Sequence, residues 1–207
     1  IDRMDNDPVL VVNGDLYHDI DLERVYHQHL RSGFDVTMAL HDHPRFNTVT
    51  VADGRVVGFD GGEGERLAFT GIHVIDPDAI ERIPRQGFFH IIDLYRELAA
   101  AGRIGCCRVD GSLWRDIGTP ADYLDLHREL LAERGWLIDP TARVAADAEL
   151  AGWGCIGAGA RVGAGARLCD AVVWDSAVVP AHTVCTGGIL TGNPLVDSGA
   201  RPRGTDG

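Results

Sequence analysis

Apolar and polar positions at the start of the chain follow the pattern of a strand, a helix and a second strand. Residues 8–12 are a continuous apolar run, which is typical of a strand buried on both faces. Between about Asp21 and Ser32 the apolar residues fall on one helical face, and Gly33 follows as a helix terminator. Residues 34–40 predict the next strand, so the stretch indicates a parallel α/β unit.

Turn and cap residues separate the elements predicted further along. A hairpin is predicted with strands over 48–52 and 55–59, because the Asp-Gly pair between them is a strong signal for a two-residue turn. Another strand is predicted over 67–75, followed by a helix over 91–101. A last helix is predicted over 120–134, with proline at the first helical position, where its missing N–H is not needed.

From residue 138 onward the apolar residues repeat with a period of six. Such a period, with one bulky and one small inward position, is typical of a hexapeptide β-helix. About two and a half triangular coils are predicted, which is marginal for a free-standing solenoid, so we expect packing against the first domain or a second subunit. The bulky positions are Ile138, Val144, Leu150, Ile156, Val162, Leu168 and Trp174, and the small or β-branched ones are Ala142, Ala148, Gly154, Ala160, Ala166, Val172 and Val178.

These patterns predict two domains and a tail. The first domain is expected over 1–135, the β-helix over 136–190, and a loosely ordered tail, rich in Gly, Pro, Asp and Arg, over 191–207. The β-helix is also the surface through which we expect any homo-oligomer to form.

Composition narrows the classes of partner. Acidic residues outnumber basic ones, 31 to 19, and the formal charge of −12 argues against nucleic acids and anionic membranes. No apolar run is long enough to span a bilayer, and the start has no signal-peptide pattern. The five cysteines include no CxxC pair, as expected of reduced thiols in a cytoplasmic protein. All 19 basic residues are arginine, so no lysine of this segment can contact a phosphate.

Two aspartates are the main candidates for chemistry. Asp15 follows a buried strand, where open parallel sheets bind ligands, and Gly14 lets a phosphate approach the backbone. Asp116 lies in an unusual loop, Trp-Arg-Asp-Ile-Gly-Thr-Pro, just before a helix. Each also has a simpler interpretation, because Asn-Gly-Asp is common in turns and Asp116 could pair with Arg115. If the two converge, they suit one Mg²⁺ ion that takes its other ligands from substrate phosphates.

Three motifs together carry a resemblance to a known family. They are Val-Val-Asn-Gly-Asp at 11–15, Phe-Thr-Gly-Ile-His-Val at 69–74 and Trp-Arg-Asp-Ile-Gly-Thr-Pro-Ala-Asp-Tyr-Leu at 114–124. In this order and spacing the chain resembles the sugar-1-phosphate nucleotidyltransferases over about residues 8–185. That family includes guanylyl-, thymidylyl- and uridylyltransferases. The resemblance implies an α/β fold: a partial, Rossmann-like nucleotidyltransferase domain with a mostly parallel sheet, followed by a short left-handed hexapeptide β-helix.

The resemblance also implies a reaction and a set of site residues. A sugar-1-phosphate oxygen would attack the α-phosphorus of a nucleoside triphosphate, giving an NDP-sugar and pyrophosphate, with catalysis from positioning and charge neutralisation. Asp15 and Asp116 would be the catalytic residues and the ligands of Mg²⁺. The implied substrate-binding residues are Asn13, Gly14, Thr70, Gly71 and Trp114.

Two departures from the family pattern keep other interpretations open. The family's glycine-rich nucleotide loop is expected about a hundred residues before Ile1, and the family lysine that holds the sugar phosphate has no match, which leaves Arg66 as a nearby candidate. One alternative is a non-catalytic regulatory or assembly homologue. Another is a hexapeptide acyltransferase with His182 as general base. The pair His41-x-His43 could bind a metal, although a solvated loop is the simpler expectation.

Overall fold

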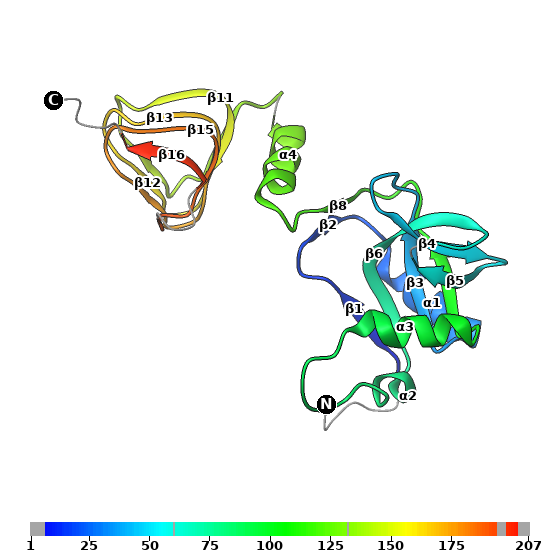
Figure 1. Cartoon of the computed structure of the whole chain (residues 1–207). Helices are drawn as coiled ribbons and strands as arrows, with labels where there is room; N and C mark the ends of the chain where they lie inside the picture. The colour runs from blue at the N-terminus through cyan, green and yellow to red at the C-terminus, as the bar shows by residue number, and fades with distance from the viewer. Residues whose placement is uncertain (1–6, 60, 132, 194–197, 203–207) are drawn as a thin grey trace. The chain divides into compact units, whose positions relative to one another are not determined.

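A computed structural model describes residues 7–59, 61–131 and 133–193, together with the backbone of residues 198–202. The described chain forms two compact units, the first ending at Asp116 and the second beginning at Ile117 (Figure 1). Each unit has its own hydrophobic core. None of the helices in the described residues has the length and apolar character needed to cross a bilayer.

The first unit is built on a six-stranded sheet with the strand order β1-β6-β3-β7-β5-β4. Only β3 and β7 pair in parallel, whereas every other pair in the sheet is antiparallel, so the predicted mostly parallel sheet is wrong. The reason is that the chain turns back through the β4–β5 hairpin and returns as the long strand β6, which needs no helical crossover. The strands are β1 (Val9–Val12), β3 (Val36–His41), β4 (Asn47–Ala52), β5 (Arg55–Phe59), β6 (Glu65–Ile75) and β7 (Ile104–Arg108).

Helices of the first unit pack on both faces of the sheet. Helix α1 (Leu22–Ser32) begins where the Asp21 side chain accepts the N–H of Arg24, and it ends at Gly33, whose φ is +69°, as predicted. It packs in one core with Ala39 and Ile72, while helix α3 (Ile91–Ala100) packs in another with the alternate residues of β3. The short helix α2 (Pro77–Ile80) follows β6.

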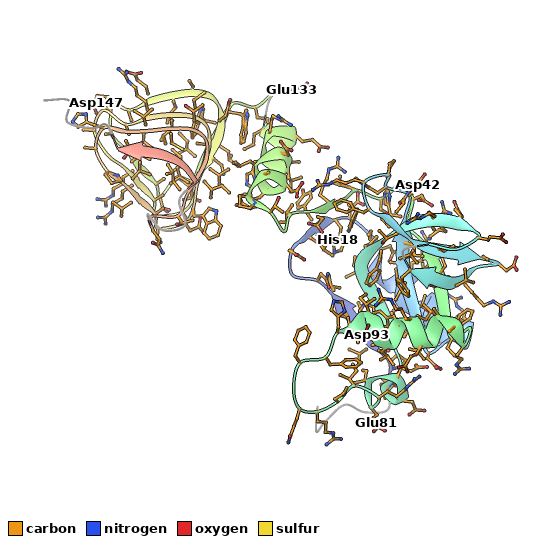
Figure 2. All side chains as sticks on the ribbon, in the orientation of Figure 1. His18, Asp42, Glu81, Asp93, Glu133 and Asp147 are labelled. Atoms are coloured by element: carbon orange, nitrogen blue, oxygen red, sulfur yellow. The ribbon has the colours of Figure 1, made fainter. Side chains whose placement is uncertain are left out.

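A separate two-stranded ribbon completes the first unit. Strand β2 (Leu16–His18) follows β1 almost directly, and it pairs antiparallel with β8 (Trp114–Asp116) near the end of the unit. Figure 2 shows His18 on this ribbon. The ribbon therefore joins two segments that are far apart in the sequence.

The second unit is a stack of parallel strands preceded by one helix, as expected of a β-helix. One sheet contains β9 (Trp136–Ile138), β11 (Glu149–Ile156), β13 (Arg167–Val173) and β15 (Thr183–Leu190). The other contains three two-residue strands, β10 (Arg143–Val144), β12 (Arg161–Val162) and β14 (Val178–Val179). Parallel partners stand 18 residues apart between the first coils, since Val144 pairs with Val162 and Leu150 with Leu168.

The six-residue ladder slips by one residue at a corner of the second coil. Strands β11 and β13 stay in register up to Ala151 and Cys169, after which Gly154 pairs with Ala171. In β11 the corner contains two residues, Gly152 and Trp153, whereas in β13 it contains one, Asp170, which has φ +51°. The consequence is that the core residue is Val173, which is 1% exposed, and not Trp174, which is 47% exposed.

The slip also overturns the predicted inward position of Val178. Its side chain is 57% exposed, and Ala177 and Val179 are buried in its place. The left-handed conformation of Asp170 cannot be found from the spacing of apolar residues, because it is adopted by a single polar residue between them.

The ends of the second unit differ in detail from the expectation. Helix α4 (Pro120–Leu131), whose first turn is capped by the Thr119 hydroxyl, packs on the coil through a cluster that includes Leu131, Trp153 and Val172. The helix therefore belongs with the coil in the structure, although the sequence grouped it with residues 1–135. Within the predicted loose tail, Ser198–Pro202 forms strand β16, antiparallel to β15, while 194–197 and 203–207 lie outside the described residues.

Candidate functional site

The loop after β1 carries three of the predicted site residues. Strand β1 ends at Val12, and Asn13, Gly14 and Asp15 are exposed to solvent. The backbone N–H of Asn13 donates to the carbonyl oxygen of Gly71 on β6 at 3.0 Å. This bond fixes the start of the loop against the middle of the neighbouring strand.

Gly71 lies in a bulge of β6. The register between β3 and β6 shifts between Met38 and Leu40, where one residue of β3 opposes three of β6. Gly71 has φ +77°, and a Cβ atom added to it would lie 2.7 Å from the Nδ2 atom of Asn13. Glycine is therefore required here both for the backbone conformation and for the close approach of Asn13.

Thr70 and Trp114 support this bulge from inside the protein. The Thr70 side chain is fully buried, and its hydroxyl donates to the carbonyl oxygen of Ala39 at 2.8 Å. The indole N–H of Trp114, which is 3% exposed, donates to the carbonyl oxygen of Thr70 at 3.0 Å. Both side chains hold the backbone around Gly71 in place, and neither is exposed to a ligand in solution.

The β2–β8 ribbon brings the two candidate aspartates together. In its register Leu16 is directly opposite Asp116, so the backbone of Asp15, the residue before Leu16, lies one position along from Asp116. Asp15 is exposed and Asp116 is partly buried. Two aspartates from opposite ends of the first unit thus have backbones at adjoining strand ends, and Asp15 follows the Asn13–Gly71 contact by two residues.

Asp19 is a residue that the sequence reasoning missed. Its backbone N–H donates to the carbonyl oxygen of Leu113 at 3.1 Å, and its side-chain Oδ1 accepts the N–H of Leu113 at 2.7 Å. These two bonds extend the pairing of β2 with β8 and position the segment that carries Asp116. No local pattern could have indicated this, because the partner lies almost the whole length of the unit away.

An aromatic cluster packs around Trp114. The rings of His41, His43 and Phe46 have centroids within 6.1 Å of the Trp114 ring. Both ring nitrogens of His41 lie against backbone carbonyl oxygens, those of Asp42 and Ser112. The His41-x-His43 pair is therefore partly buried packing and not the solvated loop that was expected.

The other candidate residues have surroundings of their own. His73 is buried against Tyr95, and the His73 Nε2 atom lies 2.6 Å from the Tyr95 hydroxyl. Burial lowers the pKa of His73 to about 4. Arg66 is exposed on β6, opposite Thr50. His182, the residue of the acyltransferase alternative, is exposed at a corner of the second unit with φ +59°.

The donor set suits an ion that brings most of its own ligands. No group of three or more His, Cys, Asp or Glu side chains that could hold a metal occurs in the part of the chain that the structure describes. The backbones of Asp15 and Asp116 adjoin in the β2–β8 register, and an ion such as Mg²⁺ needs only one or two carboxylates, because it keeps waters and substrate phosphates as its other ligands.

Comparisons with known proteins agree with the motifs. No protein-family model matches the chain. Its curated relatives are sugar-1-phosphate nucleotidyltransferases, which confirms the resemblance carried by the three motifs. One of them is mannose-1-phosphate guanylyltransferase of Mycobacterium tuberculosis, which is 34% identical over 88% of this chain and 56% of that protein.

Two further relatives point to the same class. A putative mannose-1-phosphate guanyltransferase of Sulfolobus acidocaldarius is 27% identical over 81% of this chain and 48% of that protein. The N-acetylmuramate α-1-phosphate uridylyltransferase of Caulobacter vibrioides is 33% identical over 41% of this chain and 34% of that protein. The chain spans about half the length of the first two relatives.

Proposed function

We propose that this chain is the sugar-facing part of a nucleotidyltransferase that joins a nucleoside triphosphate to a sugar 1-phosphate, giving an NDP-sugar and pyrophosphate. The observation that supports the proposal is the register of β2 and β8, in which the backbones of Asp15 and Asp116 adjoin close to the Asn13–Gly71 contact. The named activities of the relatives support the same reaction.

Each residue of the candidate site has a proposed role in binding the metal, binding the sugar or supporting the backbone. Asp15 and Asp116 would hold Mg²⁺, which when bound shields the charge of the nucleotide α-phosphate from the incoming sugar phosphate. Gly71 is buried beneath the Asn13 side chain and acts by letting Asn13 lie close against β6, while the exposed Asn13 amide can donate to a sugar hydroxyl. Thr70 and Trp114 act indirectly, by keeping the bulge rigid through their buried hydrogen bonds. Catalysis then comes from positioning and charge neutralisation, with no covalent enzyme intermediate.

Substrate choice and location follow as parts of the same proposal. The two relatives that cover most of the chain are named for mannose 1-phosphate and guanylyl transfer, so GTP with mannose 1-phosphate is the first substrate pair to assay. All five cysteines are free thiols, which supports a reducing, cytoplasmic environment.

Pyrophosphate release by the intact gene product tests the reaction. With GTP, mannose 1-phosphate and Mg²⁺, we expect turnover that Asp116→Asn and Asp15→Asn each reduce by about 100-fold or more, since each removes charge from the metal site. Asp93→Asn is the matched control, because Asp93 lies on α3, is exposed and contacts Arg96 (Figure 2). Equal turnover by Asp116→Asn and by Asp93→Asn would refute the metal assignment. Absence of turnover with every common nucleoside triphosphate would instead favour the non-catalytic homologue.

A further inference from the structure

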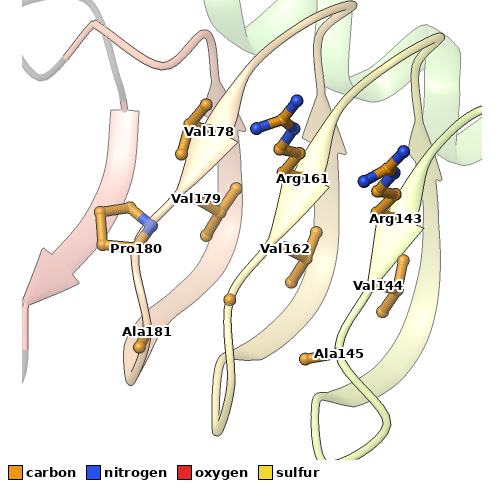
Figure 3. Close-up of a pocket in the computed structure, with 10 residues that line it drawn as sticks. Arg143, Val144, Ala145, Arg161, Val162, Val178, Val179, Pro180 and Ala181 are labelled. Atoms are coloured by element: carbon orange, nitrogen blue, oxygen red, sulfur yellow. The ribbon is translucent and has the colours of Figure 1, made fainter.

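A groove on the second unit combines two arginines with apolar walls. Strands β10, β12 and β14 form this face, and Arg143, Arg161 and Val178 are partners in adjacent parallel strands. Figure 3 shows the guanidinium groups of Arg143 and Arg161 pointing the same way from neighbouring strands. The groove has a volume of about 450 Å³, and Pro180 and Ala181 are among its apolar lining residues.

The two guanidinium groups carry like charges on adjacent strands and repel one another. Adjacent strands stand about 4.8 Å apart, and like charges placed opposite each other on neighbouring strands are destabilising. Among the residues that the structure describes, neither Arg143 nor Arg161 takes part in an ion pair. Both side chains are exposed, so their charges face solvent.

The neighbouring face of the same coil shows how such a position is normally neutralised. There Arg167 has Glu149 as its partner on the adjacent strand, and the Arg167 Nε atom lies 3.1 Å from the Glu149 Oε2 atom. The register is equivalent, but the pair has opposite charges. The same coil thus places a glutamate beside an arginine on one face and two arginines side by side on the other.

The protein is acidic overall, which makes two adjacent arginines without a carboxylate partner in the described part of the chain a distinctive feature of its surface. The chain carries 31 acidic and only 19 basic residues, so carboxylates are in excess. Several exposed arginines elsewhere are paired with carboxylates: Arg82 with Glu97, Arg96 with Asp93, Arg103 with Asp35, Arg108 with Glu65 and Asp110, and Arg128 with Asp125. Others, such as Arg66 and Arg85, have no ion pair among the described residues, but the strand register does not place them beside a second arginine. The pair Arg143 and Arg161 thus forms a local positive site on an acidic protein.

We propose that Arg143 and Arg161 bind the phosphate group of a small molecule in this groove. Each guanidinium presents a planar fork of N–H donors, and a phosphate dianion has enough charge and oxygen atoms to accept from both forks. A carboxylate carries a single charge and two oxygen atoms, so it fits one fork. Beyond the arginines, Val178 and Pro180 provide an apolar wall, which suits an organic phosphate ester as well as free phosphate.

The test is a titration of the isotopically labelled chain, followed by the NMR signals of the arginine Nε–H groups and of the backbone in the second unit. The probes are inorganic phosphate, hexyl phosphate and acetate. EDTA is present throughout, which removes divalent ions and so suppresses metal-dependent phosphate binding at Asp15 and Asp116. This condition separates the groove from the proposed catalytic site.

The variants are matched by position and charge. Arg143→Gln and Arg161→Gln are each expected to weaken phosphate binding by about fivefold or more, because each removes one fork. Arg161→Lys, which keeps the charge without the fork, is expected to retain part of the affinity. Arg167→Gln, on the neighbouring face, is the control and is expected to bind phosphate like the unaltered chain. Tighter binding of hexyl phosphate than of inorganic phosphate would identify an ester, and equal affinity would identify free phosphate.

Three results would overturn the proposal: shifts that spread over the surface without involving Arg143 or Arg161, equal weakening by Arg167→Gln, or acetate binding as tightly as phosphate. Circular dichroism of each variant checks that the coil is intact. Pyrophosphate release by Arg161→Gln is expected to match that of the unaltered protein, so failure of the groove and failure of the catalytic proposal are distinguishable.

Discussion

Acidification is expected to destabilise the first unit through one buried histidine. His73 is 6% exposed, and its ring is hydrogen-bonded to the Tyr95 hydroxyl at 2.6 Å. Burial lowers the pKa of His73 from 6.5 to about 4, because the charged ring would be poorly solvated in the core. The folded unit therefore keeps the ring neutral in a pH range where the unfolded chain takes up a proton.

The direction and the size of the effect follow from the two pKa values of His73. As the pH falls, the unfolded chain binds the proton first. The contribution of His73 to the free energy of unfolding is therefore fully present above about pH 6.5 and is lost between about pH 6.5 and pH 4. From about pH 7 to about pH 5 the loss from this residue is about 2 kcal/mol. Below about pH 4 both states carry the proton, and the contribution of His73 no longer changes with pH.

Denaturant unfolding at several pH values measures this loss. Trp114 reports on the first unit when the tryptophans of the second unit, Trp136, Trp153 and Trp174, are replaced by phenylalanine. The comparison is with a double variant, His73→Leu with Tyr95→Phe, which removes the titrating ring and its partner's hydroxyl together. His27→Gln is the control, because the His27 side chain is 53% exposed.

The role of His73 is tested by comparing how the free energy of unfolding depends on pH in the unaltered unit and in the double variant. The free energy of unfolding of the unaltered unit should fall by about 2 kcal/mol more than that of the double variant over this pH range, and His27→Gln should follow the unaltered unit. Parallel pH curves for the unaltered unit and the double variant would refute the role assigned to His73.

Two further substitutions test local features of the fold. Gly71→Ala is expected to lower the free energy of unfolding by about 1–3 kcal/mol, because φ is +77° and the new Cβ atom would lie 2.7 Å from the Asn13 Nδ2 atom. Gly14→Ala, where an added Cβ meets nothing within 4 Å, is its control in the same urea titration, and equal midpoints would contradict the account of the bulge. In the second unit, Val173→Ala is expected to cost about 1–3 kcal/mol and Trp174→Ala less, because the former residue is 1% exposed and the latter 47%. If thermal unfolding showed a larger loss for Trp174→Ala than for Val173→Ala, Trp174 would be the core residue and the six-residue period would continue without a slip.

Elements encoded by neighbouring residues could be predicted from the sequence. The helix over Leu22–Ser32 is defined by its apolar face, by the Asp21 cap and by Gly33, all within one short segment. The same holds for the β4–β5 hairpin, whose turn residue Asp53 adopts φ +48° beside Gly54. Signals of this kind depend only on local geometry, so no knowledge of the rest of the chain is needed.

Strand direction and coil register could not be predicted in the same way. An apolar run indicates a buried strand, but it does not say which partner the strand takes, and β6 pairs antiparallel with β1, β3 and β4. The corner at Asp170 shortens a coil by one residue without disturbing the apparent period, so Trp174 was assigned to the wrong side.

The candidate site was predictable in part for the same reasons. The motifs indicated Asp15, Gly71 and Asp116 as candidates, because each motif is a continuous stretch of sequence. They could not indicate that the Trp114 indole bonds to the backbone beside Gly71, or that Asp19 bonds to Leu113, since both contacts form only in the folded unit. The supporting contacts of the site are therefore a property of the tertiary structure.

Binding of Mn²⁺ in place of Mg²⁺ tests the central claim most directly, because a paramagnetic ion broadens the NMR signals of the nuclei around it. We predict that Mn²⁺ broadens the backbone amides of residues 13–18 and 114–116, which flank Asp15 and Asp116 on the β2–β8 ribbon, and that Asp116→Asn removes this broadening while Asp93→Asn does not. Broadening centred elsewhere in the chain, or unchanged broadening in Asp116→Asn, would contradict the claim that these two aspartates share one divalent ion.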